Sequence, residues 1–216
     1  IRYKVQPNPN GIAEAFLLSQ NFLGNSPSAL ILGDNLFHGN ELIEQLQIAN
    51  KRTVGSTIFA YHVSNPESYG VIEFDSHGKP KDIIEKPKKA KSNYAITGLY
   101  FYDNQVIEYA KNIRPSKRGE LEISSINQVY LEHNNLNVEI MGRGMTWLDT
   151  GTFDSLHQAS SYIRTLELRQ GLKVGCPEEI AWRNKWINDR QLNEIANKLT
   201  KSGYGDYLVK LLNGSP

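Results

Sequence analysis

The chain of 216 residues has a formal net charge of +1, from 24 basic and 23 acidic side chains, so no overall field draws it to nucleic acid or to an anionic membrane. Its single cysteine, Cys176, excludes an internal disulfide framework and suits a reducing compartment. Because no apolar run approaches ~20 residues and no charged-then-apolar leader opens the sequence, we expect one large soluble domain in the cytoplasm.

The N-terminal segment predicts a strand, a loop and a helix. Residues 1–5 alternate like a strand, residues 6–11 carry two prolines and a glycine, and residues 12–18 show a helical pattern. From this segment alone, a plain strand-to-helix loop is the preferred interpretation. The flat amide of Gln6 near the helix start could also meet a planar base.

An apolar run over residues 29–32, followed by Gly33 and Asp34, predicts a strand buried on both faces of a parallel sheet. Asp34 then lies just past its carboxyl end, where open α/β sheets bind ligands. A similar stretch ends at Asp149. Two such carboxylates suit Mg²⁺, which takes one or two carboxylates with substrate phosphates. An Asx turn or a helix N-cap explains either aspartate equally well.

The middle of the chain continues as alternating elements. A helix over 41–50 and a strand over 57–63 favour a parallel α/β sheet with right-handed crossovers. Residues 69–75 and 81–87 predict a β-hairpin, which ends in adjacent Glu85 and Lys86. Neighbouring strand side chains point to opposite faces, so both can serve one ligand only if the strand end twists. A solvated strand end is the alternative.

Later segments predict one long strand and then mainly helices. Residues 93–103 read as a strand whose central Gly98 indicates close approach by a ligand or another backbone. We expect the remaining elements as follows: helices over 104–111 and 120–133, a strand over 137–141, helices starting at residues 153, 177 and 189, and a last helix over 204–212. The chain therefore divides into an α/β domain, 1–152, and a helical extension, 153–216.

Several short motifs occur together in one order. They are Gln6-Pro-Asn-Pro-Asn-Gly11, Leu32-Gly-Asp-Asn35, Tyr69-Gly-Val71, Glu85-Lys-Pro87, residues 93–103, Arg118-Gly-Glu-Leu-Glu-Ile123 and Trp147-Leu-Asp-Thr-Gly-Thr152. In this combination the chain resembles the glucose-1-phosphate thymidylyltransferase family over its whole length. The resemblance implies a Rossmann-like nucleotidyltransferase sheet, mostly parallel and three-layered, with a β-hairpin sugar-binding insertion and a C-terminal helical appendage.

The same resemblance implies a reaction and its setting. Members of the family join dTTP and α-D-glucose 1-phosphate, with Mg²⁺, to give dTDP-glucose and diphosphate. This is the first step towards dTDP-L-rhamnose and surface polysaccharide such as lipopolysaccharide. A homotetramer with allosteric inhibition by a dTDP-sugar end product is implied in the same way.

The family's functional residues carry over by position. Gln6 and Gly11 would read the thymine edge, while Asp34 and Asp149 would hold magnesium and form the catalytic set with Lys86. The sugar-phosphate pocket would comprise Gly70, Glu85, Lys86, Thr97, Gly98, Tyr100 and Arg118. A second, regulatory nucleotide site at a subunit contact would draw on Gly39, Glu41, Glu178 and Arg183.

One family feature has no counterpart in these residues. The family opens with a strand running into a glycine-rich Leu-Ala-Gly-Gly-x-Gly-Thr-Arg-Leu loop, followed by a lysine, which together cradle the triphosphate. We therefore interpret the sequence as the C-terminal part of such an enzyme and expect no transferase activity from these residues alone. The alternatives are a transferase that uses UTP or CTP, and a non-catalytic regulatory protein that binds nucleotide sugars.

Overall fold

The computed structural model describes residues 1–214 and divides the chain into two compact units, Ile1–Asp149 and Thr150 onward. The boundary expected after residue 152 lies close to this division. Within the described residues, no helix combines the length and the apolar character needed to cross a membrane.

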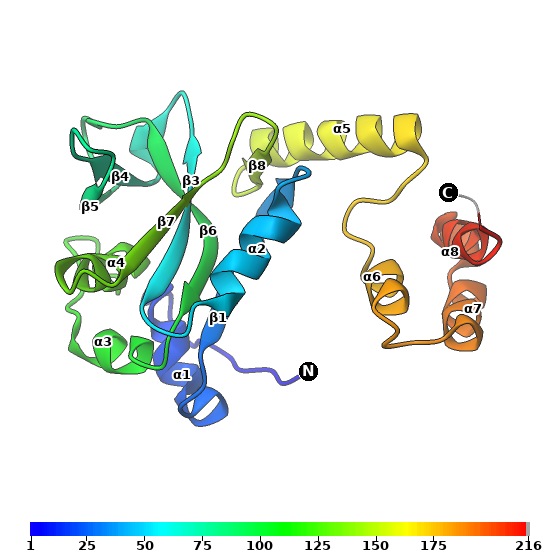
Figure 1. Ribbon diagram of the computed structural model, residues 1–216, viewed down its shortest axis with the longest axis horizontal. Coiled ribbons are helices and arrows are strands. Elements are labelled where there is room, and N and C mark those ends of the chain that lie inside the picture. The colour runs from blue at the N-terminus through cyan, green and yellow to red at the C-terminus, as the bar shows by residue number, and fades with distance from the viewer. Residues whose placement is uncertain (215–216) are drawn as a thin grey trace. The chain divides into compact units, whose positions relative to one another are not determined.

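The first unit is built on a mixed sheet (Figure 1). Its strands are β1 (Ser28–Ile31), β3 (Ser56–His62), β4 (Gly70–Phe74), β5 (Pro80–Glu85), β6 (Tyr94–Tyr102) and β7 (Leu136–Ile140). They lie in the order β5-β4-β6-β3-β7, and β1 also pairs with β6. The α/β class and the predicted hairpin of β4 and β5 are confirmed.

The strand directions are more mixed than expected. β1, β3 and β7 run the same way, but β6 lies between β1 and β3 and is antiparallel to both. Among the described strands of this sheet, only β3 and β7 pair in parallel. A parallel neighbour needs a crossover of a dozen or more residues, whereas a short loop joins β4 to β5, and these two strands pair antiparallel. The other edge of β4 pairs antiparallel with β6.

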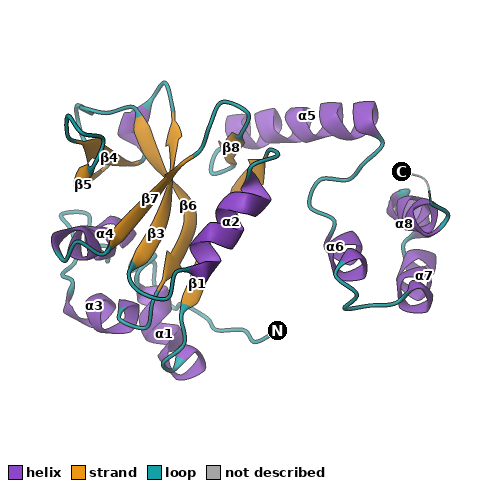
Figure 2. Cartoon of the chain, in the orientation of Figure 1, coloured by secondary structure: helices purple, strands orange, loops and turns teal. Residues whose placement is uncertain are grey.

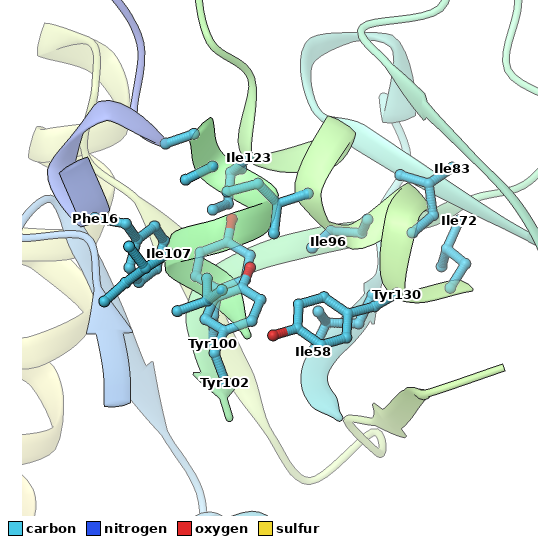
Figure 3. Close-up of a cluster of buried hydrophobic side chains, with 14 of the residues drawn as sticks. Phe16, Ile58, Ile72, Ile83, Ile96, Tyr100, Tyr102, Ile107, Ile123 and Tyr130 are labelled. Atoms are coloured by element: carbon cyan, nitrogen blue, oxygen red, sulfur yellow. The ribbon is translucent and has the colours of Figure 1, made fainter. Parts of the chain in front are cut away.

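Helices cover both faces of the sheet, which gives the predicted three layers. On one face, α1 (Glu14–Leu23), α3 (Val106–Asn112) and α4 (Ile123–Glu132) pack against the strands. Figure 3 shows this core, in which Phe16, Ile58 and Tyr130 lie together. On the other face, α2 (Leu42–Lys51) contributes Ala49 to a cluster with Phe59 and Leu99.

Two sequence predictions about strands are wrong in detail. Residues 1–5 form no strand and are exposed, because alternation alone supplies no pairing partner. In β1, Leu30 packs against the core, but Ile31 is 62 % exposed, so this strand is not buried on both faces.

A two-stranded ribbon lies outside the main sheet. The predicted strand ending at Asp149 is β8 (Thr146–Asp149), and it pairs antiparallel with β2 (Asn35–His38), which the sequence did not predict. The sequence pattern did not predict β2 because its four residues show no clear alternation of apolar and polar positions.

The second unit is helical, as expected, and its described residues, 150–214, contain no strand (Figure 2). Its elements are α5 (Phe153–Gln170), α6 (Pro177–Arg183), α7 (Asp189–Lys198) and α8 (Tyr204–Leu212). The Thr152 side chain caps α5 and the Asn188 side chain caps α7, each by accepting from a backbone N–H in the first turn. Its core is formed by buried residues of α7 and α8, among them Leu192 and Leu208, together with Cys176 just before α6.

Candidate active site

A cleft of about 220 Å³ lies in the first unit beside β6. One edge of β6 pairs with β1 through residues 99–102 and with β4 at Ala95, so the two neighbours separate along residues 96–98. Open α/β sheets bind ligands in crevices where neighbouring connections diverge. Of the residues predicted for the site, those that line the cleft are Asp34, Gly70, Glu85, Lys86, Gly98, Tyr100 and Asp149.

The two predicted metal ligands reach the cleft from the same end of the β2–β8 ribbon. Asn35, which follows Asp34, is paired directly with Asp149 in the antiparallel register. The described residues contain no group of three or more His, Cys, Asp and Glu side chains suited to a metal. The cleft offers a pair of carboxylates, which suits Mg²⁺ because this ion takes one or two carboxylates and completes its shell with other oxygens; its binding here stays a prediction.

The twist that the sequence required after Glu85 is present. Lys86 has a φ of +41°, a left-handed backbone conformation that residues other than glycine rarely adopt. Its N–H donates to the carbonyl oxygen of Tyr69 at 3.0 Å. Because the chain turns here, Glu85 and Lys86 both line the cleft despite being adjacent. Such a conformation costs on the order of 1–3 kcal/mol and tends to occur at functional sites.

Burial raises the pKa of Glu85, while a hydrogen bond with the Ser124 side chain opposes this rise and the charge of Glu122 adds to it. Arg118 lies near both carboxylates: its Nη1 is 3.7 Å from Glu85 Oε1 and 3.6 Å from Glu122 Oε1. Its Nη2 lies 2.9 Å from Glu120 Oε1. The resemblance placed Arg118 in the pocket itself, but Arg118 is not among the residues that line the cleft. It contacts the cleft through its ion pair with Glu85.

At two positions of the cleft, close contacts explain why the residue is glycine. A Cβ atom at Gly98 would lie 2.6 Å from Asn35 Oδ1, and one at Gly70 would lie 3.1 Å from Glu85 Oε2. The close approach predicted at Gly98 is thus made by a side chain of the protein itself. Thr97 does not line the cleft, since Ile96 and Gly98 do and side chains alternate along a strand. It is fully buried.

The predicted thymine-binding residues lie together at the start of α1. Gln6 Nε2 donates to the carbonyl oxygen of Gly11 at 3.0 Å and to Glu14 Oε2 at 2.6 Å. Gly11 has a φ of +106°, and a Cβ there would lie 2.4 Å from the carbonyl oxygen of Leu121. The glycine is therefore required by local packing, and contact of either residue with a base stays a prediction.

The predicted regulatory residues are divided between the two units. Gly39 has a φ of +151° and packs against Met145, while Glu41 lies nearby at the start of α2. In the second unit, Glu178 accepts from the Tyr204 hydroxyl and Arg183 pairs with Glu179. Their joint role stays a prediction.

Sequence reasoning missed several residues of the cleft. Asn35, Tyr69 and Trp147 stood inside the motifs quoted above without a role, whereas Ser124 and Asn127 had no separate signal. The Trp147 ring lies edge-on to Tyr69, with 5.0 Å between centroids. Burial, together with the charge of Asp149, raises the pKa of Tyr69.

The nucleotidyl transferase family model matches residues 1–165, so the chain belongs to this family. Its relatives named glucose-1-phosphate thymidylyltransferase include one from Xanthomonas campestris, 53 % identical over 98 % of this chain and 72 % of the relative. Another, from Mycolicibacterium smegmatis, is 54 % identical over 99 % of this chain and 74 % of the relative. The resemblance drawn from the motifs is confirmed.

Solved structures agree with these relatives. A Bacillus anthracis structure described as a glucose-1-phosphate thymidylyltransferase in complex with sucrose is 37 % identical, with a TM-score of 0.67 over 81 % of this chain and 67 % of that one. A UDP-glucose pyrophosphorylase complexed with UDP-glucose is 25 % identical, with a TM-score of 0.65 over 74 % of this chain and 64 % of that one. The nucleotidyltransferase fold is confirmed.

Proposed function

We propose that this chain serves the conversion of dTTP and α-D-glucose 1-phosphate to dTDP-glucose and diphosphate. Its relatives show that it is an enzyme, because proteins more than 50 % identical to it are named for that activity. The observation that supports the proposal within the structure is the cleft that joins Asp34 and Asp149 to Glu85 and Lys86.

The side chains of the cleft suit a sugar phosphate. The Glu85 carboxylate can accept hydrogen bonds from sugar hydroxyls, and the Lys86 ammonium can offset the charge of a phosphate that approaches an anionic nucleotide. In this transfer a phosphate oxygen of the sugar attacks the α-phosphorus, in line with the departing diphosphate. The protein then contributes mainly positioning and charge neutralisation.

Asp34 and Asp149 would hold Mg²⁺, because both line the cleft and supply the oxygen ligands that this ion prefers. When bound, the ion supplies stabilisation of the negative charge that develops on the phosphate oxygens. Lys86 lines the same cleft, so its charge acts on the same group from the hairpin side.

A transferase that uses UTP or CTP is the alternative within the family, and the similarity to a UDP-glucose pyrophosphorylase favours its test. A non-catalytic protein that binds nucleotide sugars is the alternative from another class. The deciding assay measures Mg²⁺-dependent diphosphate release from dTTP, UTP and CTP in competition, on a sample of known intact mass. Preference for dTTP supports the proposal, preference for UTP or CTP favours the first alternative, and product binding without diphosphate release favours the second.

The wider setting forms part of the same proposal. The chain would act in the cytoplasm as a homotetramer, at the first step towards dTDP-L-rhamnose and lipopolysaccharide, with inhibition by a dTDP-sugar end product. Light scattering on the purified enzyme tests the tetramer. Relief of inhibition in Glu178→Ala and Arg183→Ala variants, with uninhibited turnover unchanged, tests the regulatory site.

A further inference from the structure

The Asn35 side chain forms three hydrogen bonds at the edge of the cleft. Its Oδ1 accepts from the backbone N–H of Gly98 at 3.0 Å and from Trp147 Nε1 at 2.6 Å. Its Nδ2 donates to Asp34 Oδ1 at 2.8 Å. One amide thus connects a strand of the main sheet, an aromatic residue of β8 and a predicted metal ligand.

The orientation of this amide follows from the chemistry of its partners. A backbone N–H and an indole N–H can only donate, so the oxygen of Asn35 must face them. The amide nitrogen is then directed at Asp34, whose carboxylate accepts. Exchange of the oxygen and nitrogen positions would oppose donor to donor at two contacts and is excluded.

The main chain fixes the position of Asn35 as firmly as its side chain does. The N–H of Leu32 donates to the carbonyl oxygen of Gly98 at 2.9 Å, and the N–H of Asn35 donates to the carbonyl oxygen of Leu32 at 3.2 Å. Both backbone groups of Gly98 are therefore used by residues 32–35. A Cβ at Gly98 would displace Asn35 Oδ1, so this contact requires glycine.

We propose that Asn35 is a positioning residue, which sets the Asp34 carboxylate and the Trp147 indole relative to each other. A hydrogen bond to one carboxylate oxygen restricts rotation of that side chain, as the outer partners of metal ligands do. Trp147 in turn lies edge-on to Tyr69, whose carbonyl oxygen accepts from the N–H of Lys86. Asn35 therefore connects the carboxylate side of the cleft to its cationic side.

The role of Asp34 in this proposal rests on the proposed function, whereas the contact with Trp147 does not. The 216 residues contain three tryptophans, so phenylalanine at every other tryptophan of the enzyme, Trp182 and Trp186 among them, leaves Trp147 as the only indole. Its emission reports the indole environment without turnover. Quenching of that emission by Mn²⁺ reports metal affinity in the same samples.

Two substitutions in the full-length enzyme separate the contacts. Asn35→Asp keeps an acceptor for Gly98 and Trp147 but removes the donor to Asp34. We expect parental Trp147 emission, a fall in kcat of about 10–100-fold and little change in KM for glucose 1-phosphate. Asn35→Leu removes all three hydrogen bonds. We expect a shift in Trp147 emission, because the indole N–H loses its acceptor, and a rise of about 10-fold in the Mn²⁺ concentration for half-maximal quenching.

Asn137→Leu is the matched control, because it removes a hydrogen bond that a side-chain amide donates to the Ser56 carbonyl oxygen, away from the cleft. It should retain the parental emission and metal response.

Unchanged kcat in Asn35→Asp, or a raised KM for glucose 1-phosphate with kcat intact, would overturn the positioning role. Parental emission in Asn35→Leu would overturn the contact with Trp147. If the parent releases no diphosphate, the proposed function fails, while the emission comparison still tests the hydrogen bonds of Asn35.

Discussion

The N–H of Lys86 donates to the carbonyl oxygen of Tyr69 at 3.0 Å, and this bond joins the two ends of the β4–β5 hairpin at the cleft. Lys86 accepts a left-handed backbone conformation in this position, with a φ of +41°. The conformation brings its side chain to the same cavity as that of Glu85. Backbone strain and the placement of charge are therefore connected at one residue.

The strain at Lys86 predicts that glycine is tolerated there better than alanine. Glycine adopts a left-handed φ without steric cost. The free energy of unfolding of Lys86→Gly should therefore be about 0.5–1 kcal/mol higher than that of Lys86→Ala. Both variants should lose turnover by about 100-fold or more, since the cation at the phosphate is gone. Chemical denaturation and initial rates measure the two effects. In α3, Lys111→Gly should instead be less stable than Lys111→Ala, because glycine weakens a helix interior.

Asp34 and Asp149 should be needed for the metal response. Replacement of either by asparagine removes a charged ligand but keeps its size. We expect the Mg²⁺ concentration for half-maximal rate to rise and kcat to fall by about 100-fold or more, which corresponds to several kcal/mol of charge stabilisation. Magnesium titrations of the initial rate measure both effects. Asp206→Asn on α8 is the control, and a normal magnesium requirement in either cleft variant would contradict the assignment.

The raised pKa of Glu85 predicts how stability and activity change with pH. Burial disfavours the charged form, so the folded enzyme holds this proton to higher pH than the unfolded chain does. The stabilising contribution is complete below the ordinary glutamate pKa and is lost as pH rises through the raised value. Glu85→Gln should therefore be at least as stable as the parent at pH 7, as measured by thermal unfolding.

The activity of the Glu85 variant gives a second readout. In the parent, kcat/KM should fall on acidification at a pH above the usual glutamate range, because the protonated carboxyl accepts sugar hydroxyls poorly. Glu85→Gln should have low activity and should lack this acid limb. Glu194→Gln on the exposed face of α7 should keep the parental profile. An unchanged profile in Glu85→Gln would contradict the role of Glu85.

The second unit should respond to substitution of its own core. Leu192 is fully buried among residues of α6 to α8, so Leu192→Ala should cost about 2–5 kcal/mol in that unit. Hydrogen exchange should become faster in α7 and α8, and the amides of β3 and β6 should keep their protection. Leu168→Ala is the control, since that side chain is 69 % exposed. Equal loss of protection in both units would contradict their separate cores.

Local sequence signals determined most of the elements of this protein. Helices begin at Pro177 and Asp189, where the sequence predicted them, because a fixed φ and side-chain caps act within one turn. The hairpin of β4 and β5 and the long strand β6 were also predicted, from turn residues and β-rich runs. The order of short motifs indicated the family, which the relatives confirm.

Only the tertiary structure decided how these elements form a site. The pairing of Asn35 with Asp149, the direction of β6, and the contact of Arg118 with Glu85 each join segments that are distant in the chain. The sequence alone offered Asp34 and Asp149 equally as turn residues or as ligands. A residue's own conformational preference and its spacing from near neighbours can be read locally, but strand partners and shared cavities depend on contacts that form only when the whole unit folds.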